Sequence, residues 1–257
     1  MAYIDFHTHL HQYADPDGCL AAMERADIMA VACSVDVPSY LATLALAERS
    51  RRIIPTFGIH PSRATEYAPR LEGLLPLLEA GSLIGEIGLD QRWWRQVPKR
   101  DQEAVFSWFL AHCAARDKYC VIHTKGAERR VLEMLDYYKV TKAVIHWYHG
   151  PNSVYRRLLD RGYYQTFGCE LRYSWTVRRQ LRQTPPELIL AETDNPTAEK
   201  WLGGRLDGPE LIGRVVLDIA RTLGLRPELA RLLIFGNAIR LLGGGMPALD
   251  VTKTSGA

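Results

Sequence analysis

Short apolar runs alternate with segments of helical periodicity along almost the whole chain, and this alternation constrains the fold more than any other feature. It favours parallel strands joined by helical crossovers, and about eight such runs favour a closed TIM-type (β/α)8 barrel over an open doubly wound sheet. No G-x-G-x-x-G turn follows the first run, which argues against a dinucleotide-binding sheet. The expected strands are residues 3–9, 28–35, 53–59, 82–90, 119–123, 143–148, 163–167 and 188–194. The expected helices are residues 19–27, 39–51, 71–80, 99–117, 128–138, 153–161, 178–183, 209–223 and 228–235.

The composition fits one large domain. The chain has 257 residues, 47% of them hydrophobic, which is enough to bury a single sizeable core. We predict an α/β barrel domain over residues 1–250 and a disordered tail over 251–257. The formal net charge is only +3, so the surface lacks the strong positive stripe of a DNA-reading module. Any contact with nucleic acid is therefore expected inside a site.

The cysteines and the hydropathy pattern bear on the compartment. Five cysteines are an odd number and include no C-x-x-C pair, which is typical of free thiols in a reducing compartment. No basic segment with an apolar core opens the chain, and no apolar run approaches the roughly 18 residues that a membrane span needs. We expect a cytoplasmic protein with no membrane association.

Two histidines, His7 and His9, end the first apolar run. Side chains at positions i and i+2 of a strand point to the same face, so both imidazoles can reach one point in space. This geometry suits a metal ion. An H-x-H pair alone fits ordinary polar residues at a strand end equally well, and the other strand ends must decide between the two interpretations.

Nitrogen and carboxylate groups recur at the ends of the expected strands. The active site of a TIM barrel lies at the carboxyl ends of its strands, so residues far apart in sequence converge there. Each of them, taken alone, is more often a satisfied polar residue, a helix cap or an ion-pair partner. Together they indicate a metal site, because so many strand ends supply ligand atoms. They are His7, His9, His60, Glu86, His123, His146 and Asp194.

This set is too large for one tetrahedral ion, which takes about three protein ligands and a water. It suits two divalent ions that share a carboxylate. One ion would take His7, His9 and Asp194, the other would take His123 and His146, and Glu86 would bridge them. Two such ions about 3.5–4 Å apart can clamp the attacking and leaving oxygens of a displacement, which favours an anionic ester as substrate. The sequence leaves the metal open among Mg²⁺, Zn²⁺ and Mn²⁺.

At these positions the chain resembles the TatD family of metal-dependent deoxyribonucleases, within the amidohydrolase-like TIM barrels. The matching motifs are D-x-H-x-H at 5–9, G-x-H-P at 58–61, G-E-x-G-L-D at 85–90, I-H at 122–123, I-H at 145–146 with a glycine at 150, E-T-D-x-P at 192–196 and N-A at 237–238. They span nearly the whole chain. The resemblance implies hydrolysis of DNA phosphodiesters, often from a 3′ end and on single strands, with Mg²⁺ or a related ion.

The resemblance also implies roles for single residues. It makes His7, His9, Glu86, His123, His146 and Asp194 metal ligands, and it places His60 near the substrate phosphate. Glu86 and Asp194 would be the catalytic carboxylates, with Asp194 taking the proton of the attacking water because it already lies within reach. Glu192 would orient a metal ligand, as carboxylates behind a metal site commonly do.

Several residues depart from the family pattern or extend it. Lys125 stands where the family commonly has arginine, and a bulky Trp147-Tyr148-His149 follows His146, so the pocket wall and the substrate class are open. Trp93 and Trp94 follow Glu86 at the active-site face, where an indole can stack on a nucleobase. It is equally consistent that at least one of them packs between the barrel and its helices.

Three functions follow from the sequence. The first is a two-metal nuclease that cleaves DNA, single-stranded or at 3′ ends, as a 3′-5′ exonuclease. The second is hydrolysis of a small ester, amide or lactone, since one barrel supports many chemistries. The third is a catalytically idle barrel that serves as a binding subunit, which the complete ligand set argues against. The sequence does not indicate an oligomeric state.

Overall fold

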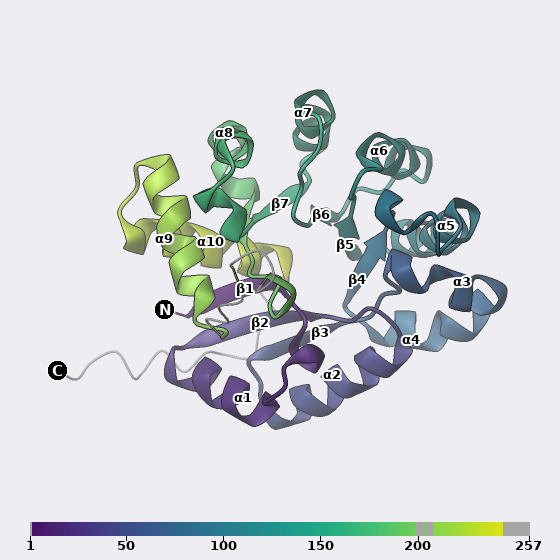
Figure 1. The fold of residues 1–257 in the computed structure, drawn as a ribbon, viewed down its shortest axis with the longest axis horizontal. Coiled ribbons are helices and arrows are strands. Elements are labelled where there is room, and N and C mark those ends of the chain that lie inside the picture. The colour runs from purple at the N-terminus through teal and green to yellow at the C-terminus, as the bar shows by residue number, and fades with distance from the viewer. Residues whose placement is uncertain (1, 199–202, 204–207, 244–257) are drawn as a thin grey trace.

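The computed structural model describes residues 2–198, 203 and 208–243. In these ranges the chain forms an α/β barrel whose strands lie at the centre and whose helices surround them (Figure 1). The strands are β1 (Tyr3–Thr8), β2 (Ile28–Cys33), β3 (Ile53–Thr56), β4 (Leu83–Gly88), β5 (Tyr119–His123), β6 (Ala143–Ile145), β7 (Tyr164–Phe167) and β8 (Ile189–Ala191). The helices are α1 (Pro16–Arg25), α2 (Val37–Arg49), α3 (Ala64–Tyr67), α4 (Leu75–Ala80), α5 (Lys99–Ala115), α6 (Glu128–Tyr137), α7 (Asn152–Asp160), α8 (Trp175–Gln183), α9 (Leu211–Leu223) and α10 (Pro227–Leu241).

All strand pairs are parallel and follow the order of the chain. β1, β2 and β3 form one hydrogen-bonded sheet, and β4 to β8 form a second. The register aligns the carboxyl ends of neighbouring strands; for example, Gly88 of β4 lies opposite His123 of β5. A one-residue slip would turn every side chain to the other face, so this register determines which side chains point into the site.

Two seams join the sheets into a closed barrel. Between β3 and β4, the amide of Gly85 donates to the carbonyl of Phe57 at 2.8 Å. At the other seam the amide of Asp194, after β8, donates to the carbonyl of His7 at 2.9 Å, and the amide of His9 donates to Asn195 at 2.8 Å. The predicted TIM-type barrel is therefore confirmed, and the second seam runs directly through predicted site residues.

The β3–β4 seam depends on a glycine. A methyl group at Gly58 would lie 2.6 Å from the backbone nitrogen of Glu86, closer than any real contact of this kind. Only glycine lets the chain after β3 approach β4 so closely. The first residue of the G-x-H-P motif thus helps to place Glu86.

The strands are buried on both faces, as expected for a parallel barrel covered by helices. All six residues of β2 and all six of β4 are buried, and the same holds for β6, β7 and β8. Local signals start and stop the helices around them. Asp36 and Ser39 form a reciprocal capping box at the start of α2, and Gly224 ends α9 in the left-handed conformation.

Some element boundaries differ from the predicted ones. The helix expected over 71–80 begins at Leu75, after a 3₁₀ segment with a kink at Arg70, because Pro76 fits the first turn of a helix and not its interior. The helix expected over 228–235 continues to Leu241, so Gly236 is tolerated inside it. β6 and β8 stop at Ile145 and Ala191, before the polar residues assigned to them.

Two further expectations concern the extent of the chain. The predicted tail, 251–257, lies outside the described residues, so the boundary of the domain near residue 250 stays a prediction. Within the described part of the chain, no helix combines the length and the apolar character that crossing a membrane requires. The five cysteines are all free and buried, as the odd count suggested.

Candidate active site

A cavity of about 460 Å³ opens at the carboxyl ends of the barrel strands. Most of the predicted site residues line it, although they come from strands spread over almost 190 residues of sequence. Three predicted residues do not line it, namely Trp94 and the fully buried His7 and Glu192. The predicted residues that line the cavity are His9, His60, Glu86, Trp93, His123, Lys125, His146 and Asp194.

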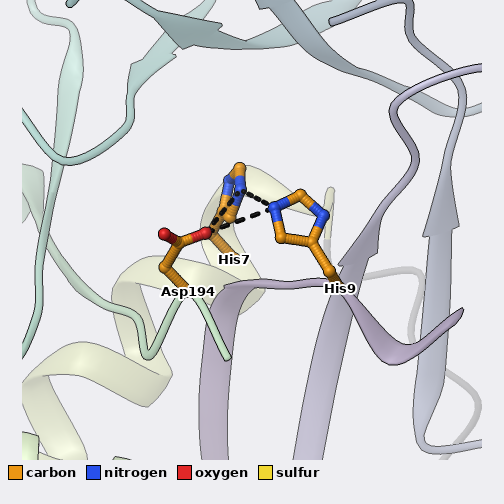
Figure 2. Close-up of side chains that lie close together, drawn as sticks. All are labelled: His7, His9 and Asp194. Atoms are coloured by element: carbon orange, nitrogen blue, oxygen red, sulfur yellow. Dashed lines mark hydrogen bonds and ion pairs between the residues drawn. The ribbon is translucent and has the colours of Figure 1, made fainter. Parts of the chain in front are cut away.

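His7, His9 and Asp194 form the first group of donor atoms (Figure 2). Nε2 of His7 lies 3.4 Å from Nε2 of His9, and Oδ1 of Asp194 lies 3.6 Å from the former and 3.2 Å from the latter. Oε2 of Glu86 approaches the same two nitrogens at 3.5 and 3.6 Å. Figure 2 shows the two rings and the carboxylate turned toward one common point.

These distances fit a metal ion. Four ligands about 2.0–2.1 Å from a tetrahedral ion lie roughly 3.3 Å apart from one another. The measured separations of 3.2–3.6 Å match this spacing. Two imidazole nitrogens that face each other and two carboxylate oxygens are also the donor types that divalent transition ions prefer. The first group could therefore hold one ion.

The backbone positions the first group on both sides of the barrel seam. Nδ1 of His9 is 3.0 Å from the carbonyl oxygen of Cys33, which fixes the proton on Nδ1 and leaves the lone pair of Nε2 directed at the site. Asp5 accepts hydrogen bonds from the amide and hydroxyl of Thr193, which ties β1 to the segment that carries Asp194. Asp194 itself has φ of 54°, a left-handed conformation that Asp tolerates better than most residues.

The second group of donor atoms gathers on the other oxygen of Glu86. Oε1 lies 2.8 Å from Nδ1 of His123, 3.6 Å from Nε2 of His146 and 3.9 Å from Nε2 of His60. Glu86, His123 and His146 are close enough to hold one ion together. Glu86 therefore directs one oxygen at each group, which is the arrangement of a carboxylate between two ions.

Acidic residues behind the second group orient its rings. Nδ1 of His146 donates to Oε2 of Glu192 at 2.7 Å, so its Nε2 faces Glu86, as the predicted orienting role of Glu192 requires. Nε2 of His123 lies 3.0 Å from Oδ2 of Asp90. Asp90 is fully buried and is held in turn by the guanidinium of Arg92, whose NH2 group donates at 2.6 Å. Both ring orientations are thus determined by a carboxylate.

The carboxylates of the two groups are ionised. Burial alone would raise the pKa of Glu86, but His60, His7 and His123 reverse the effect and hold it well below its usual value. Burial likewise opposes ionisation of Asp194, and the hydrogen bond from His9 outweighs it and lowers the pKa. Charged carboxylates are the form that binds a cation.

The histidines fall into two classes. Burial lowers the pKa of His7, and it lowers the pKa of His60 to about 3 and of His146 to about 4, so these rings are neutral. Burial also disfavours a charge on His9 and His123, but Asp194 raises the pKa of the former to about 9, and Asp90 and Glu86 raise that of the latter to about 9. A cation bound there would replace these protons.

The residues predicted to contact substrate separate into two sets. His60, Lys125 and Trp93 line the cavity, as do Trp147 and His149 of the bulky segment. Trp94 instead packs against the core, with the Lys99 ammonium 5.5 Å from its ring centre. Tyr148 is also buried, and its hydroxyl donates to the carbonyl of Pro151, so it is not part of the wall.

Three residues of the site were missed by the sequence interpretation. Asp90 is the last residue of the G-E-x-G-L-D motif, so the motif itself could have indicated it. Arg92 belongs to none of the motifs, yet it lines the cavity and binds Asp90. Glu170 also lines the cavity, and no motif or apolar run marked it.

Comparisons with known proteins identify the family and support the fold. The family model described as TatD related DNase matches residues 4–243. The chain is 28% identical to the uncharacterized metal-dependent hydrolase TatD of Mycobacterium tuberculosis, covering 94% of this chain and 98% of the other. It is 32% identical to the 3′-5′ ssDNA/RNA exonuclease TatD of Enterobacter lignolyticus, covering 70% and 74% of the two chains. The crystal structure of YjjV, a TatD homologue from Escherichia coli K12, superimposes with a TM-score of 0.81 at 22% identity, over 93% and 97% of the two chains.

Proposed function

Because the chain belongs to the TatD-related DNase family, we propose that it is a two-metal phosphodiesterase that cleaves single-stranded DNA from the 3′ end. The family predicted from the motifs is confirmed, and its class is that of hydrolases acting on phosphodiester bonds. The relative from Enterobacter lignolyticus is named for single-stranded DNA and RNA, which supports the choice of substrate and polarity.

The position of Glu86 carries the proposal. Its Oε2 faces His7 and His9 at 3.5 and 3.6 Å, and its Oε1 faces His123 and His146 at 2.8 and 3.6 Å. A buried carboxylate costs free energy unless positive charge compensates it on every side. Two ions, one against each oxygen, would supply that compensation in place of the protons on His9 and His123.

The proposed ligands are those that the sequence indicated. His7, His9 and Asp194 would hold one ion, His123 and His146 the other, and Glu86 would contact both. When bound, a pair of divalent ions such as Mg²⁺, Zn²⁺ or Mn²⁺ lowers the pKa of a bound water and stabilises negative charge on the phosphate. The donor set, rich in imidazole, is compatible with Zn²⁺ and Mn²⁺ as well as Mg²⁺.

The side chains supply the remaining steps. Asp194 is ionised, lines the cavity and is therefore placed to accept the proton of the attacking water. Glu192 keeps the His146 ring in one orientation, so that Nε2 stays directed at Glu86. A displaced imidazole ring would lower the rate of cleavage, even though the chemistry of the ring itself is unchanged.

The cavity wall offers groups for a polynucleotide. Lys125 is half-buried and lies with His60 in the wall, where a cation and a neutral imidazole can meet phosphate oxygens. Trp93 is 39% exposed beside them and can stack on an unpaired base. Paired bases in a duplex cannot be reached in this way, which supports a single-stranded substrate.

A metal analysis combined with a cleavage assay tests the proposal. The purified protein should contain about two divalent ions per chain and should shorten a 5′-labelled single-stranded oligonucleotide. Glu86→Gln keeps the shape of the side chain but removes its charge, so both the metal content and cleavage should fall. Glu133→Gln, which changes an exposed carboxylate of α6 in the same way, is the matched control and should retain both.

Other outcomes would select other functions. Bound metal without cleavage of any phosphodiester would favour hydrolysis of a small ester, amide or lactone, for which Trp147 and His149 would have reshaped the wall. A preparation that binds no divalent ion would contradict both enzymatic functions. It would favour the third function, a catalytically idle barrel that serves as a binding subunit. The cytoplasmic location expected from five free thiols stays a prediction.

A further inference from the structure

Glu170 is a buried carboxyl group in the cavity wall that the proposed metal ligands do not use. It lies in the 3₁₀ turn Cys169–Arg172 directly after β7, and only 2% of the residue is exposed. Its neighbours in the wall include Asp194 and His146 from the adjoining strands. A carboxyl group in a cavity built for a phosphate anion would repel the substrate if it were charged, so its presence there requires an explanation.

The two oxygens of Glu170 differ in their surroundings. Oε1 accepts a hydrogen bond from the amide of Gly168 at 3.1 Å, which folds the side chain back over the end of β7. Oε2 is buried and has no hydrogen-bond partner among the described residues. Unpartnered buried oxygens are rare, because each costs about 1–3 kcal/mol, and they commonly mark a functional position.

The local backbone is built around this side chain. A methyl group at Gly168 would lie 3.0 Å from Oε2, so glycine leaves the space that the carboxyl group occupies. The carbonyl of Glu170 accepts hydrogen bonds from the amides of Tyr173 and Ser174, which fixes the turn. Glu170 is thus a rigidly held residue of the cavity wall, and its Oε2 is a buried oxygen without a partner among the described residues.

Glu170 carries a proton at neutral pH. Burial is the main cause that raises the pKa of Glu170 to about 8, and two acidic neighbours act in the same direction, Glu192, whose own pKa burial raises to about 8, and Asp194. Lys125, a cationic side chain that also lines the cavity, is not among the main influences on the pKa of Glu170, and the hydrogen bond from Gly168 does not offset the burial. A protonated carboxyl group no longer repels a phosphate and can donate its hydrogen.

We propose that Glu170 is the general acid that protonates the leaving oxygen of the cleaved phosphodiester. In this step, which rests on the proposed function, the bond between phosphorus and the leaving sugar oxygen breaks and its electron pair stays on that oxygen. The hydrogen on Oε2 of Glu170 transfers to the oxygen, which leaves as a neutral alcohol. Glu170 becomes a carboxylate and regains its proton from water after the products depart.

Two substrates with different leaving groups test this role. A sugar alkoxide is a strong base and needs a proton to leave, whereas p-nitrophenolate is a weak base and leaves without one. Glu170→Gln has nearly the same shape but cannot give up a proton. It should therefore cleave a single-stranded oligonucleotide about 100-fold more slowly than the unaltered protein, and cleave thymidine 5′-p-nitrophenyl phosphate at an unchanged rate.

A matched control is available in Glu128→Gln. Glu128 is a buried carboxylate at the start of α6 that does not line the catalytic cavity, so its replacement should affect neither substrate selectively. Equal losses on both substrates in Glu170→Gln, with normal thermal unfolding, would overturn the general-acid role. No loss on the oligonucleotide would overturn it as well.

The failure of this inference can be told apart from failure of the proposed function. If the unaltered protein cleaves neither phosphodiester, the nuclease itself is excluded and the role of Glu170 with it. If Glu170→Gln does not fold, Glu170→Asp decides, because it retains the acid one methylene further from the cavity. Glu170→Asp should also lose rate on the oligonucleotide alone, and a parallel loss on both substrates would again contradict the proposal.

Discussion

Nδ1 of His146 lies 2.7 Å from Oε2 of Glu192, and both groups are almost completely buried. The ring is held at its back by this hydrogen bond while its face stacks on His7, with 3.6 Å between the ring centres. His146 therefore links the two donor groups mechanically as well as through Glu86. Glu192, which contacts neither the cavity nor the proposed ions, decides where Nε2 of His146 points.

Replacing Glu192 should therefore weaken the second ion and leave the first in place. Glu192→Gln keeps the volume but changes the partner of Nδ1, and such changes behind a metal ligand typically cost about 10- to 100-fold in affinity or activity. Metal titration should show one of two binding steps shifted to higher concentration. Glu187→Gln, an exposed carboxylate just before β8, is the control and should leave both steps unchanged. A shift of both steps together would contradict separate donor groups.

The two adjacent tryptophans should behave differently. Trp93→Ala removes an exposed indole from the cavity wall, so KM for a single-stranded oligonucleotide should rise by about 10-fold or more with little change in thermal stability. Trp94→Ala removes an indole packed on the core, so it should lower the melting temperature and leave KM unchanged. Steady-state kinetics and thermal unfolding of the two variants check both statements. An unchanged KM in Trp93→Ala would exclude stacking at this position.

Glu170 should make a contribution to the stability of the metal-free protein that falls as the pH rises from about 5 to 8. Burial raises the pKa of Glu170 to about 8, whereas the unfolded chain releases this proton near pH 4.5. Between these values Glu170 keeps its proton in the folded state and has released it in the unfolded state, so its contribution to the free energy of unfolding decreases with pH. Glu170→Gln removes this contribution and should melt at least about 2 °C higher than the unaltered protein at pH 8.5. Scanning both proteins at pH 5 and 8.5 tests the sign, and an equal pH slope would show that Glu170 does not titrate as inferred.

Two glycine replacements should have opposite effects on stability. Gly58→Ala places a methyl group 2.6 Å from the backbone of Glu86, so it should destabilise the barrel by about 1–3 kcal/mol and displace the bridging carboxylate. Gly236→Ala meets no atom within 4 Å and lies inside α10, so it should stabilise the protein by about 0.5–1 kcal/mol. Denaturant unfolding measures both. A stable, fully active Gly58→Ala protein would contradict the close approach of β3 and β4.

The barrel could be predicted from the sequence because the strands are buried on both faces and therefore appear in the sequence as continuous apolar runs. β5 is Tyr119–His123, as predicted, since the run is bounded by polar residues on both sides. The helix α10 was underestimated because glycine is a weak stop signal when helical packing continues beyond it. Helix propensity determines the end of a helix only where tertiary packing does not stabilise a further turn.

The convergence of the proposed metal ligands was predictable for a different reason. His7, His9, His123 and His146 lie in or directly after strands, and parallel strands bring their carboxyl ends together whatever the sequence between them. Glu170 and Arg92 come from short 3₁₀ turns, whose direction depends on contacts that no periodicity records. Trp93 and Trp94 show the same limit, because they are adjacent in one short turn and yet one lines the cavity while the other packs on the core.

The seam between β1 and β8 also has a consequence for how the protein is made. His7 and Asp194 meet there through the hydrogen bond between their backbones, and their side chains belong to one donor group. During synthesis His7 and His9 are made before Asp194, which emerges from the ribosome only after strands β2 to β8. The first donor group is thus incomplete until the last strand has been made, and it is assembled in the same event that closes the barrel.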